Sequence, residues 1–258
     1  LFLTIVALPL VASPITYLIG RVSVRNNKPW GMNLAKIFAL AVVVAEMVLV
    51  GFAVKAALAA GNFTLTIGSV MMVFDGIGLL ISAVVLVLGA CAMLFSFRYI
   101  RGEKGEEKFY ALLLITIGCI IGLSFSYDLF NMWVWFEGMA VSTYLLVAFY
   151  NDQPASLEAG FKYLVQSAVG SALVLFGIAV IFSVAGSTSF EYIWYLDSAG
   201  GAFTILGGVL LVVGFGVKTA LVPLHTWLPD AHSRAPSGIS AMLSGIVIEA
   251  GLVAMLRV

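Results

Sequence analysis

Five ionisable side chains lie inside apolar segments long enough to cross a membrane, where a charge needs a partner or a task. They are Glu46, Glu137, Lys162, Lys218 and Glu249. A charged side chain at the centre of a membrane helix costs about 2.5 to 3.5 kcal/mol on insertion scales. Carboxylates and an ammonium at this depth can exchange a proton or a cation. They therefore predict an ion-translocation site, with a lateral hydrogen bond as the first interpretation of Glu46.

Pro223 predicts an interruption of the helix that carries Lys218. A proline inside a helix cannot donate its amide, and its ring collides with the carbonyl one turn earlier. We expect the helix to break near Leu221. The freed carbonyls must face protein or a hydrated cavity, because lipid cannot satisfy them. Lys218 directly before the break is then either a proton relay or an ammonium held permanently by Glu137.

The charges near mid-membrane do not balance in the sequence. Glu137 and Glu249 supply two negative charges against the single positive charge of Lys218. A buried carboxylate without a partner keeps a proton or recruits a cation, and an ion-conducting site requires either behaviour. Lys162 either balances the charge or extends to the interface, since long basic side chains reach water from helix ends. We assign ion translocation to Glu137, Lys218, Glu249 and Lys162.

The segment after the break carries His225, Asp230 and His232. Histidine titrates near neutral pH, so we assign these residues to proton uptake. Structural hydrogen bonding is the alternative, and the same three side chains form only a weak metal-binding pattern. We predict no metal and no cofactor in this chain, because cysteine pairs of the CxxC type and nucleotide-binding loops are missing.

The elements that position these residues are expected to be membrane helices. The chain has 258 residues, of which 62% are apolar and only 10% are charged. Soluble proteins carry roughly 25% charged residues. The sequence thus predicts an all-α polytopic membrane protein with about eight spans, the seventh of them discontinuous. The spans are expected at 1–19, 32–58, 76–97, 109–126, 129–150, 159–184, 202–224 and 237–258.

The loops between these spans predict an orientation. Cytoplasmic loops collect Lys and Arg. The odd-numbered loops hold ten such residues and the even-numbered loops hold only Lys55. The ten are Arg21, Arg25, Lys28, Lys36, Arg98, Arg101, Lys104, Lys108, Lys162 and Arg234. This asymmetry predicts a plasma-membrane protein with both ends of the chain outside, and a formal net charge of zero excludes nucleic-acid binding.

Three other features carry simpler expectations. Asp75 and Asp128 lie at span ends and are interpreted as helix-capping or interfacial residues. The charged run 98–108 is interpreted as a solvated loop. The segment at the start lacks a basic region and a cleavage site, so we expect a first span and not a signal peptide.

One long stretch resembles a known family. KTALVPLHTWLPDAHSRAPSGISAMLSG, at 218–245, resembles the broken-helix region of antiporter-like subunits of respiratory complex I, multisubunit cation/proton antiporters and membrane-bound hydrogenases. FDGIGLL from Phe74, NMWVWFEGMAVSTYLLV from Asn131 and EAGFKYLVQSAVGSALVLFGIAVIF from Glu158 are similar to the family's third, fifth and sixth helices.

The resemblance implies a fold and a site. It implies a three-helix region at 1–108, a five-helix repeat at 109–258, and a central ion pair between Glu137 and Lys218. Many family members have lysine or histidine where this chain has Glu249. A second, inverted five-helix bundle is usual in the family and does not occur within these residues.

The resemblance also implies a function and partners. We expect a subunit that moves H⁺ or Na⁺ within a redox-driven or antiporter complex, with a non-pumping scaffold subunit as the alternative. The expected partners are lipid and other membrane subunits. The complementary bundle is expected either in one of these subunits or in a longer form of this polypeptide. No catalysis is expected from this chain alone. Iron–sulfur or other redox centres are expected in partner subunits of a hydrogenase-type or quinone-reductase-type complex.

Overall fold

The computed structural model describes residues 2–26, 29–68, 70–194 and 201–258. Lys28 of the predicted basic loop lies outside these residues. So do Leu1, at the start of the predicted first span, and positions 195–200 in the aromatic loop after the sixth span.

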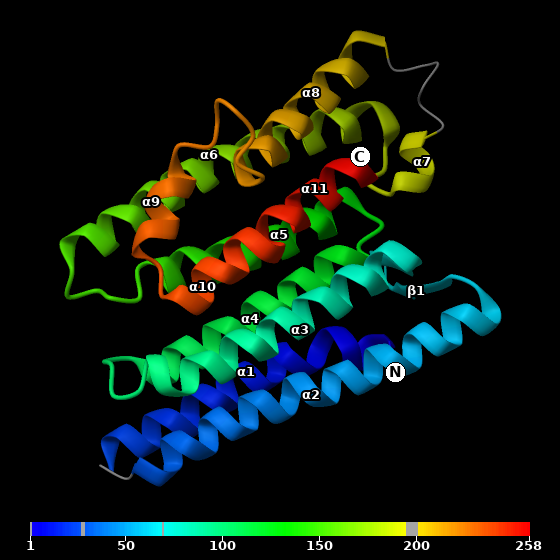
Figure 1. The fold of residues 1–258 in the computed structure, drawn as a ribbon. Helices are drawn as coiled ribbons and strands as arrows, with labels where there is room; N and C mark the ends of the chain where they lie inside the picture. Colours follow the sequence, from blue (N-terminus) through cyan, green and yellow to red (C-terminus); the bar gives the residue numbers. More distant parts are fainter. Residues whose placement is uncertain (1, 27–28, 69, 195–200) are drawn as a thin grey trace.

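The described residues form a bundle of long apolar helices (Figure 1). Within the described ranges, seven helical stretches are long and apolar enough to cross a membrane: α1 (Phe2–Arg25), α2 (Pro29–Ala60), α3 (Gly76–Tyr99), α4 (Glu106–Phe125), α6 (Pro154–Ala185), α8 (Gly201–Lys218) and the continuous stretch Ser237–Arg257. The predicted fifth span is α5 (Leu129–Val147), which packs between α4 and α6 but is made less apolar by Asn131 and Glu137. The predicted all-α polytopic membrane fold is confirmed.

Helix α4 is the centre of the N-terminal part of the bundle. It contacts α1, α2, α3 and α5, and nearly all of its residues are buried. Its buried apolar side chains include Phe109, Leu113 and Ile117, which join the hydrophobic core. This central position explains why α4 has no polar outer face.

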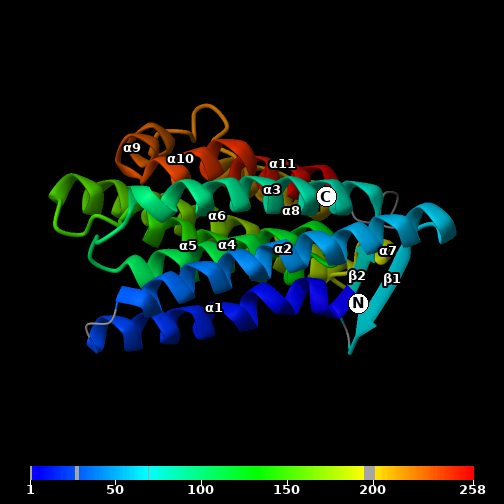
Figure 2. The same ribbon diagram turned by 60° about the horizontal axis from the view of Figure 1, so that its bottom comes forward.

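The two ends of the bundle differ. Both termini lie toward the end that carries a hairpin of β1 (Phe63–Ile67) and β2 (Val70–Phe74), and the connection between α3 and α4 lies at the opposite end (Figure 2). The strands pair antiparallel, with Phe63 opposite Phe74. The sequence analysis did not predict this hairpin. The packing of the Phe74 ring on Phe125, with centroids 4.2 Å apart, ties the hairpin to α4.

The capping interpretation of the two span-end aspartates is confirmed. The Asp75 carboxylate accepts a 2.8 Å hydrogen bond from the Gly78 amide at the start of α3. The Asp128 carboxylate accepts a 2.8 Å bond from the Asn131 amide at the start of α5. Each side chain satisfies an amide that the first turn of a helix leaves free.

The charged run 98–108 is more than a solvated loop. It holds the end of α3 and the start of α4, where the side chains of Glu106 and Glu107 are buried. Glu106 forms an ion pair with the buried Lys36 of α2, and Glu107 lies 3.6 Å from Arg21 of α1. These pairs join three helices at this end of the bundle, and the sequence offered no pattern that pairs residues so far apart.

The interruption of the seventh span is confirmed, but it begins earlier than predicted. Helix α8 ends at Lys218 instead of near Leu221. The residue that redirects the chain is Ala220, whose φ of 54° lies in the left-handed region. A helix commonly ends in that conformation. Pro223 therefore lies within the linker and not inside a helix.

Three local structures were missed in the last third of the chain. The segment after the break forms a second half-helix, α9 (Trp227–Arg234), where the sequence analysis expected only a connector. The eighth span consists of α10 (Ser237–Met242), a π-helical turn η2 (Leu243–Val247) and α11 (Ile248–Arg257). A short helix, α7 (Phe190–Trp194), follows α6.

Candidate ion-translocation site

Lys218 and Glu137 form the central ion pair of the structure. The Lys218 Nζ atom lies 2.6 Å from Glu137 Oε1, and the side chains are 3% and 33% exposed, respectively. The ammonium also lies 4.5 Å from the centre of the Phe136 ring, on the face that attracts cations. The predicted partnership between α5 and α8 is thus present in the structure.

The C-terminal end of α8 favours a positive charge at the position of Lys218. The last carbonyls of a helix have no amide partner and give its C-terminus a partial negative charge, which favours a cation there. Lys218 is the final residue of α8. Residues after the break satisfy three of these carbonyls. The Thr219 amide donates to Phe215 at 2.9 Å and the Leu221 amide to Gly216 at 2.9 Å. The Val217 carbonyl accepts from the Ala220 amide at 3.2 Å and from the Trp227 indole at 2.9 Å.

Helix α6 contacts the residues that follow the break, Thr226 and Trp227. The Trp227 ring stacks on Tyr163 with centroids 4.0 Å apart and an interplanar angle of 6°. Gln166 accepts a 3.1 Å hydrogen bond from the Trp227 amide and donates a 2.5 Å bond to Thr226. The sequence analysis did not assign Tyr163, Gln166 or Trp227 to the site. Their only signal was their presence in the segments that resemble the family.

We expect Trp227→Phe to destabilise the structure around the helix break while keeping the aromatic contact with Tyr163. Phenylalanine keeps a ring next to Tyr163 but takes the indole donor away from the Val217 carbonyl. The expected loss is about 1 kcal/mol of unfolding free energy, measured by denaturant titration of the purified protein. Trp135→Phe is the matched control, because the Trp135 indole N–H is buried without an acceptor among the described residues. An equal loss in both variants would contradict the proposed hydrogen bond.

Lys162 lies apart from the central pair. It is about half exposed and forms ion pairs of 2.8 Å with Glu158 and of 2.8 Å with Asp230. The pair with Asp230 joins α6 to α9, whereas Glu158 lies on α6 itself. The structure thus gives Lys162 surface partners and does not bring it to Lys218.

The three residues assigned to proton uptake occupy one segment but have different partners. Asp230 binds Lys162, and the His232 ring nitrogen Nδ1 lies 2.7 Å from the Ser240 hydroxyl. His225 Nδ1 is buried and has no hydrogen-bond partner among the described residues. The described part of the chain contains no group of three residues that could hold a metal.

The structure does not bring Glu249 to the pair. Its side chain is exposed on α11, while the neighbouring Ala250 and Gly251 are buried. No hydrogen bond or ion pair joins Glu249 to another described residue. The charges at the break are therefore one to one within the described residues, not two to one as the sequence predicted.

Two further groups of ionisable residues were not assigned to the site. Glu46 of α2 is fully buried, and neither carboxylate oxygen has a hydrogen-bond partner among the described residues. Arg257 of α11 donates to Asp75 at 2.8 and 3.0 Å and to the Ser124 carbonyl at 2.8 Å. The second group ties the eighth span to α3 and α4 at the hairpin end of the bundle.

The fold and the pair define a class: a polytopic helical protein in which an interrupted helix ends on a lysine that binds a glutamate of the neighbouring helix. Residues 126–258 match the family described as NADH:quinone oxidoreductase/Mrp antiporter, transmembrane. The chain belongs to this family, as the resemblance implied. It is an antiporter-like membrane subunit of the kind found in complex I, Mrp and hydrogenase-type complexes.

Individual relatives agree with this assignment. The chain is 38% identical over 179 residues to an NADH-quinone oxidoreductase subunit of Desulfitobacterium hafniense, covering 69% of this chain and 35% of that protein. It is 30% identical over 236 residues to a Na⁺/H⁺ antiporter subunit of Bacillus subtilis, covering 88% of this chain and 48% of that protein.

A solved structure shows the same fold. A chain of the membrane-bound sulfane sulfur reductase, an archaeal respiratory membrane complex, matches with a TM-score of 0.88 and 27% identity, over 98% of this chain and 52% of that one. The chain thus spans between a third and about half of the length of the relatives it matches.

Proposed function

We propose that the protein translocates H⁺ or Na⁺ through the Glu137–Lys218 pair as a membrane subunit of a redox-driven or antiporter complex. The observation that supports this most directly is the 2.6 Å ion pair at the end of an interrupted helix. A continuous helix would leave the Lys218 ammonium among saturated backbone groups. The interruption instead places it beside linker groups that can rearrange.

The proposed step is a change of partner at Lys218. With the pair closed, Glu137 stabilises the protonated lysine. A charge shift in a neighbouring subunit weakens that contact, and the lysine releases its proton along the linker toward His225. Moving one charge against 100 mV costs about 2.3 kcal/mol, which corresponds to a change of about 50-fold in proton affinity.

His225, Asp230 and His232 form the proposed route to the basic end of the bundle. His225 lies in the linker, and its Nδ1 atom, which has no partner among the described residues, is available to accept or pass a proton. Asp230 and His232 lie further along α9, and Lys162 reaches the same helix through Asp230. We propose Glu249 as a later station only where a partner covers the exposed face of α11.

Redox chemistry is proposed to take place in partner subunits. The relatives include subunits of an NADH-quinone oxidoreductase and a homologue of a hydrogenase-4 component. We propose that residues 109–258 form the translocating unit, because both members of the pair and the family match lie there. Residues 1–108 would support it. We also propose a location in the plasma membrane with both ends of the chain outside, since the termini share one end of the bundle and the basic loop 98–108 occupies the other.

A structural scaffold is the second candidate function. It is favoured by the tightness of the pair, because a lysine that is 3% exposed and closely bound is well suited to a permanent salt bridge. The two functions differ in what the pair must do: a scaffold needs only that the pair stays closed, whereas transport needs it to open.

Exchange of the two charges tests the proposal. In Glu137→Lys/Lys218→Glu, the pair re-forms with its polarity reversed, so a scaffold keeps both assembly and activity. We expect assembly to persist and proton or ²²Na⁺ uptake by vesicles to fall at least tenfold, because the ammonium no longer stands at the helix end. Uptake at the wild-type level in the exchanged protein would contradict the relay and favour the scaffold.

A further inference from the structure

A groove of about 850 Å³ runs along the outside of the bundle between α1, α4 and α5. Its floor is closed by buried Ser13 and Ala111, which are joined by a 2.8 Å hydrogen bond from the serine hydroxyl to the alanine carbonyl. On α4 it extends from Lys108 to Ile115, a length of about 10 Å. The groove has a polar end and an apolar end.

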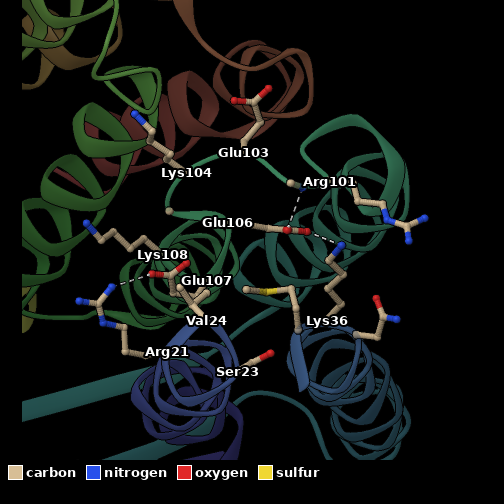
Figure 3. A pocket seen from close by; sticks show the side chains of 14 residues that line it. Arg21, Ser23, Val24, Lys36, Arg101, Glu103, Lys104, Glu106, Glu107 and Lys108 are labelled. Atoms are coloured by element: carbon tan, nitrogen blue, oxygen red, sulfur yellow. Dashed lines mark hydrogen bonds and ion pairs between the residues drawn. The ribbon is translucent and has the colours of Figure 1, made fainter. Parts of the chain in front are cut away.

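The polar end lies in the loop between α3 and α4. There the groove meets a second pocket of about 690 Å³, and the two share Lys104, Gly105 and Lys108. Figure 3 shows Lys108 and Arg21 extending to the same side of Glu107. Lys104, Lys108 and Asp152 line this end of the groove, and Arg21 and Glu107 line the adjoining pocket.

One of these cations has no partner within the described part of the chain. Lys104 binds Asp152 at 2.9 Å, and Arg21 lies 3.6 Å from Glu107. The Lys108 side chain is exposed and makes no ion pair or hydrogen bond with the described residues. The polar end therefore carries one uncompensated positive charge at the mouth of the groove.

The apolar end consists of side chains that a hydrocarbon can contact. Pro14 and Tyr17 of α1 form one wall, Leu112 and Ile115 of α4 the other, and Leu145 of α5 closes the side. Leu145 is 45% exposed. A soluble anion would use the polar end and leave this apolar surface uncovered. A molecule with an anionic head and an apolar tail complements both ends.

We infer that this groove binds one anionic phospholipid, with its phosphate group at Lys108 and an acyl chain along α1 and α4. The basic end is the end that the positive-inside rule assigns to the cytoplasmic side, where anionic lipids gather. The site is separate from the Glu137–Lys218 pair, so it stands or falls independently of the proposed ion transport.

Native mass spectrometry of the protein, purified in mild detergent with its accompanying subunits, tests this inference. Dioleoyl-phosphatidylglycerol and dioleoyl-phosphatidylcholine are added in equal amounts, and the copies retained per protein are counted. We expect saturable retention of one phosphatidylglycerol in preference to phosphatidylcholine. Lys108→Gln is expected to weaken that retention roughly fivefold, and Leu145→Trp, which fills the apolar end, should also reduce it.

Arg101→Gln is the matched control, because Arg101 is an exposed cation of the same loop, unpaired among the described residues, that lines only the neighbouring pocket. Its retention of phosphatidylglycerol should equal that of the wild type. An equal loss of phosphatidylglycerol retention in Arg101→Gln and Lys108→Gln would show that general surface charge, and not this groove, retains the lipid. Complete displacement by millimolar inorganic phosphate would make the polar end a simple anion site. Wild-type protein that retains no phosphatidylglycerol would assign the groove to a protein contact. Each of these three results overturns the inference.

Discussion

Replacement of Lys218 by methionine is expected to abolish coupled ion movement while the subunit remains assembled. Methionine fills the space of the lysine stem but has no ammonium, so it can neither carry a proton nor pair with Glu137. Glu137 is one-third exposed and can remain hydrated after its partner is lost, which limits the damage to folding. Uptake of protons or ²²Na⁺ by vesicles containing the complex should fall to background.

The control for this variant is Lys55→Met. Lys55 lies on α2, is exposed and has no ion pair among the described residues, so its loss should leave uptake within about twofold of the wild type. Lys218→Arg adds a second comparison, because arginine keeps the positive charge but cannot release its proton in proteins. Uptake at the wild-type level in Lys218→Arg would show that charge alone is sufficient and would contradict a relay through this residue.

Gly214→Ala is expected to have the largest effect on the fold outside the pair. Helices α6 and α8 approach closely at facing glycines, Gly170 and Gly177 on α6 and Gly207 and Gly214 on α8. A Cβ atom on Gly214 would lie 2.7 Å from the Gly170 carbonyl oxygen and 2.8 Å from the Val174 amide nitrogen. Backbone atoms cannot move aside as a side-chain tip can. The helices must separate, at a cost of about 1 to 3 kcal/mol.

This separation should also lower transport, because Lys218 lies one turn beyond Gly214. Gly208→Ala is the matched control on the same helix, since a Cβ atom there meets nothing within 4 Å. Alanine favours a helix over glycine by about 1 kcal/mol, so this variant should be neutral or stabilised. Thermal unfolding of both purified variants measures the difference, and a stable Gly214→Ala protein would show that the helices do not approach as closely as described.

The central pair could be predicted from sequence because its members are chemically conspicuous. A lysine and a glutamate in apolar segments need each other, and Pro223 pointed to an interruption beside the lysine. The true helix end depends on the left-handed conformation of Ala220, for which an alanine gives no signal.

Glu249 shows where such reasoning fails. Its place within the eighth span follows from the sequence, but the direction of its side chain depends on the phase of the helix. The π-helical turn at Leu243–Val247 widens the helix by one residue just before Glu249 and turns all later positions. An estimate of side-chain direction from the sequence assumes a constant 3.6 residues per turn, so it misses the rotation that the π-helical turn causes.

The buried pair of Lys36 and Glu106 was missed for a different reason. The two residues are far apart in the sequence and lie on helices, α2 and α4, that come together only when the chain folds. The sequence analysis counted Lys36 with the basic loops and Glu106 with the solvated loop 98–108. The same holds for Gln166 and Trp227, whose polar groups satisfy backbone atoms of the break. Only the arrangement of α6 against both half-helices brings them together.

That arrangement has a mechanical consequence. Helix α6 is continuous, and it holds α8 through the glycine contacts and α9 through Tyr163 and Gln166. Both halves of the interrupted span are therefore held by the same continuous helix, α6. While α6 stays straight, a backbone movement of the interrupted span is confined to the eight positions 219–226. In the proposed transport step, the hinge is therefore this short stretch of backbone, and α8 and α9 on either side of it stay rigid.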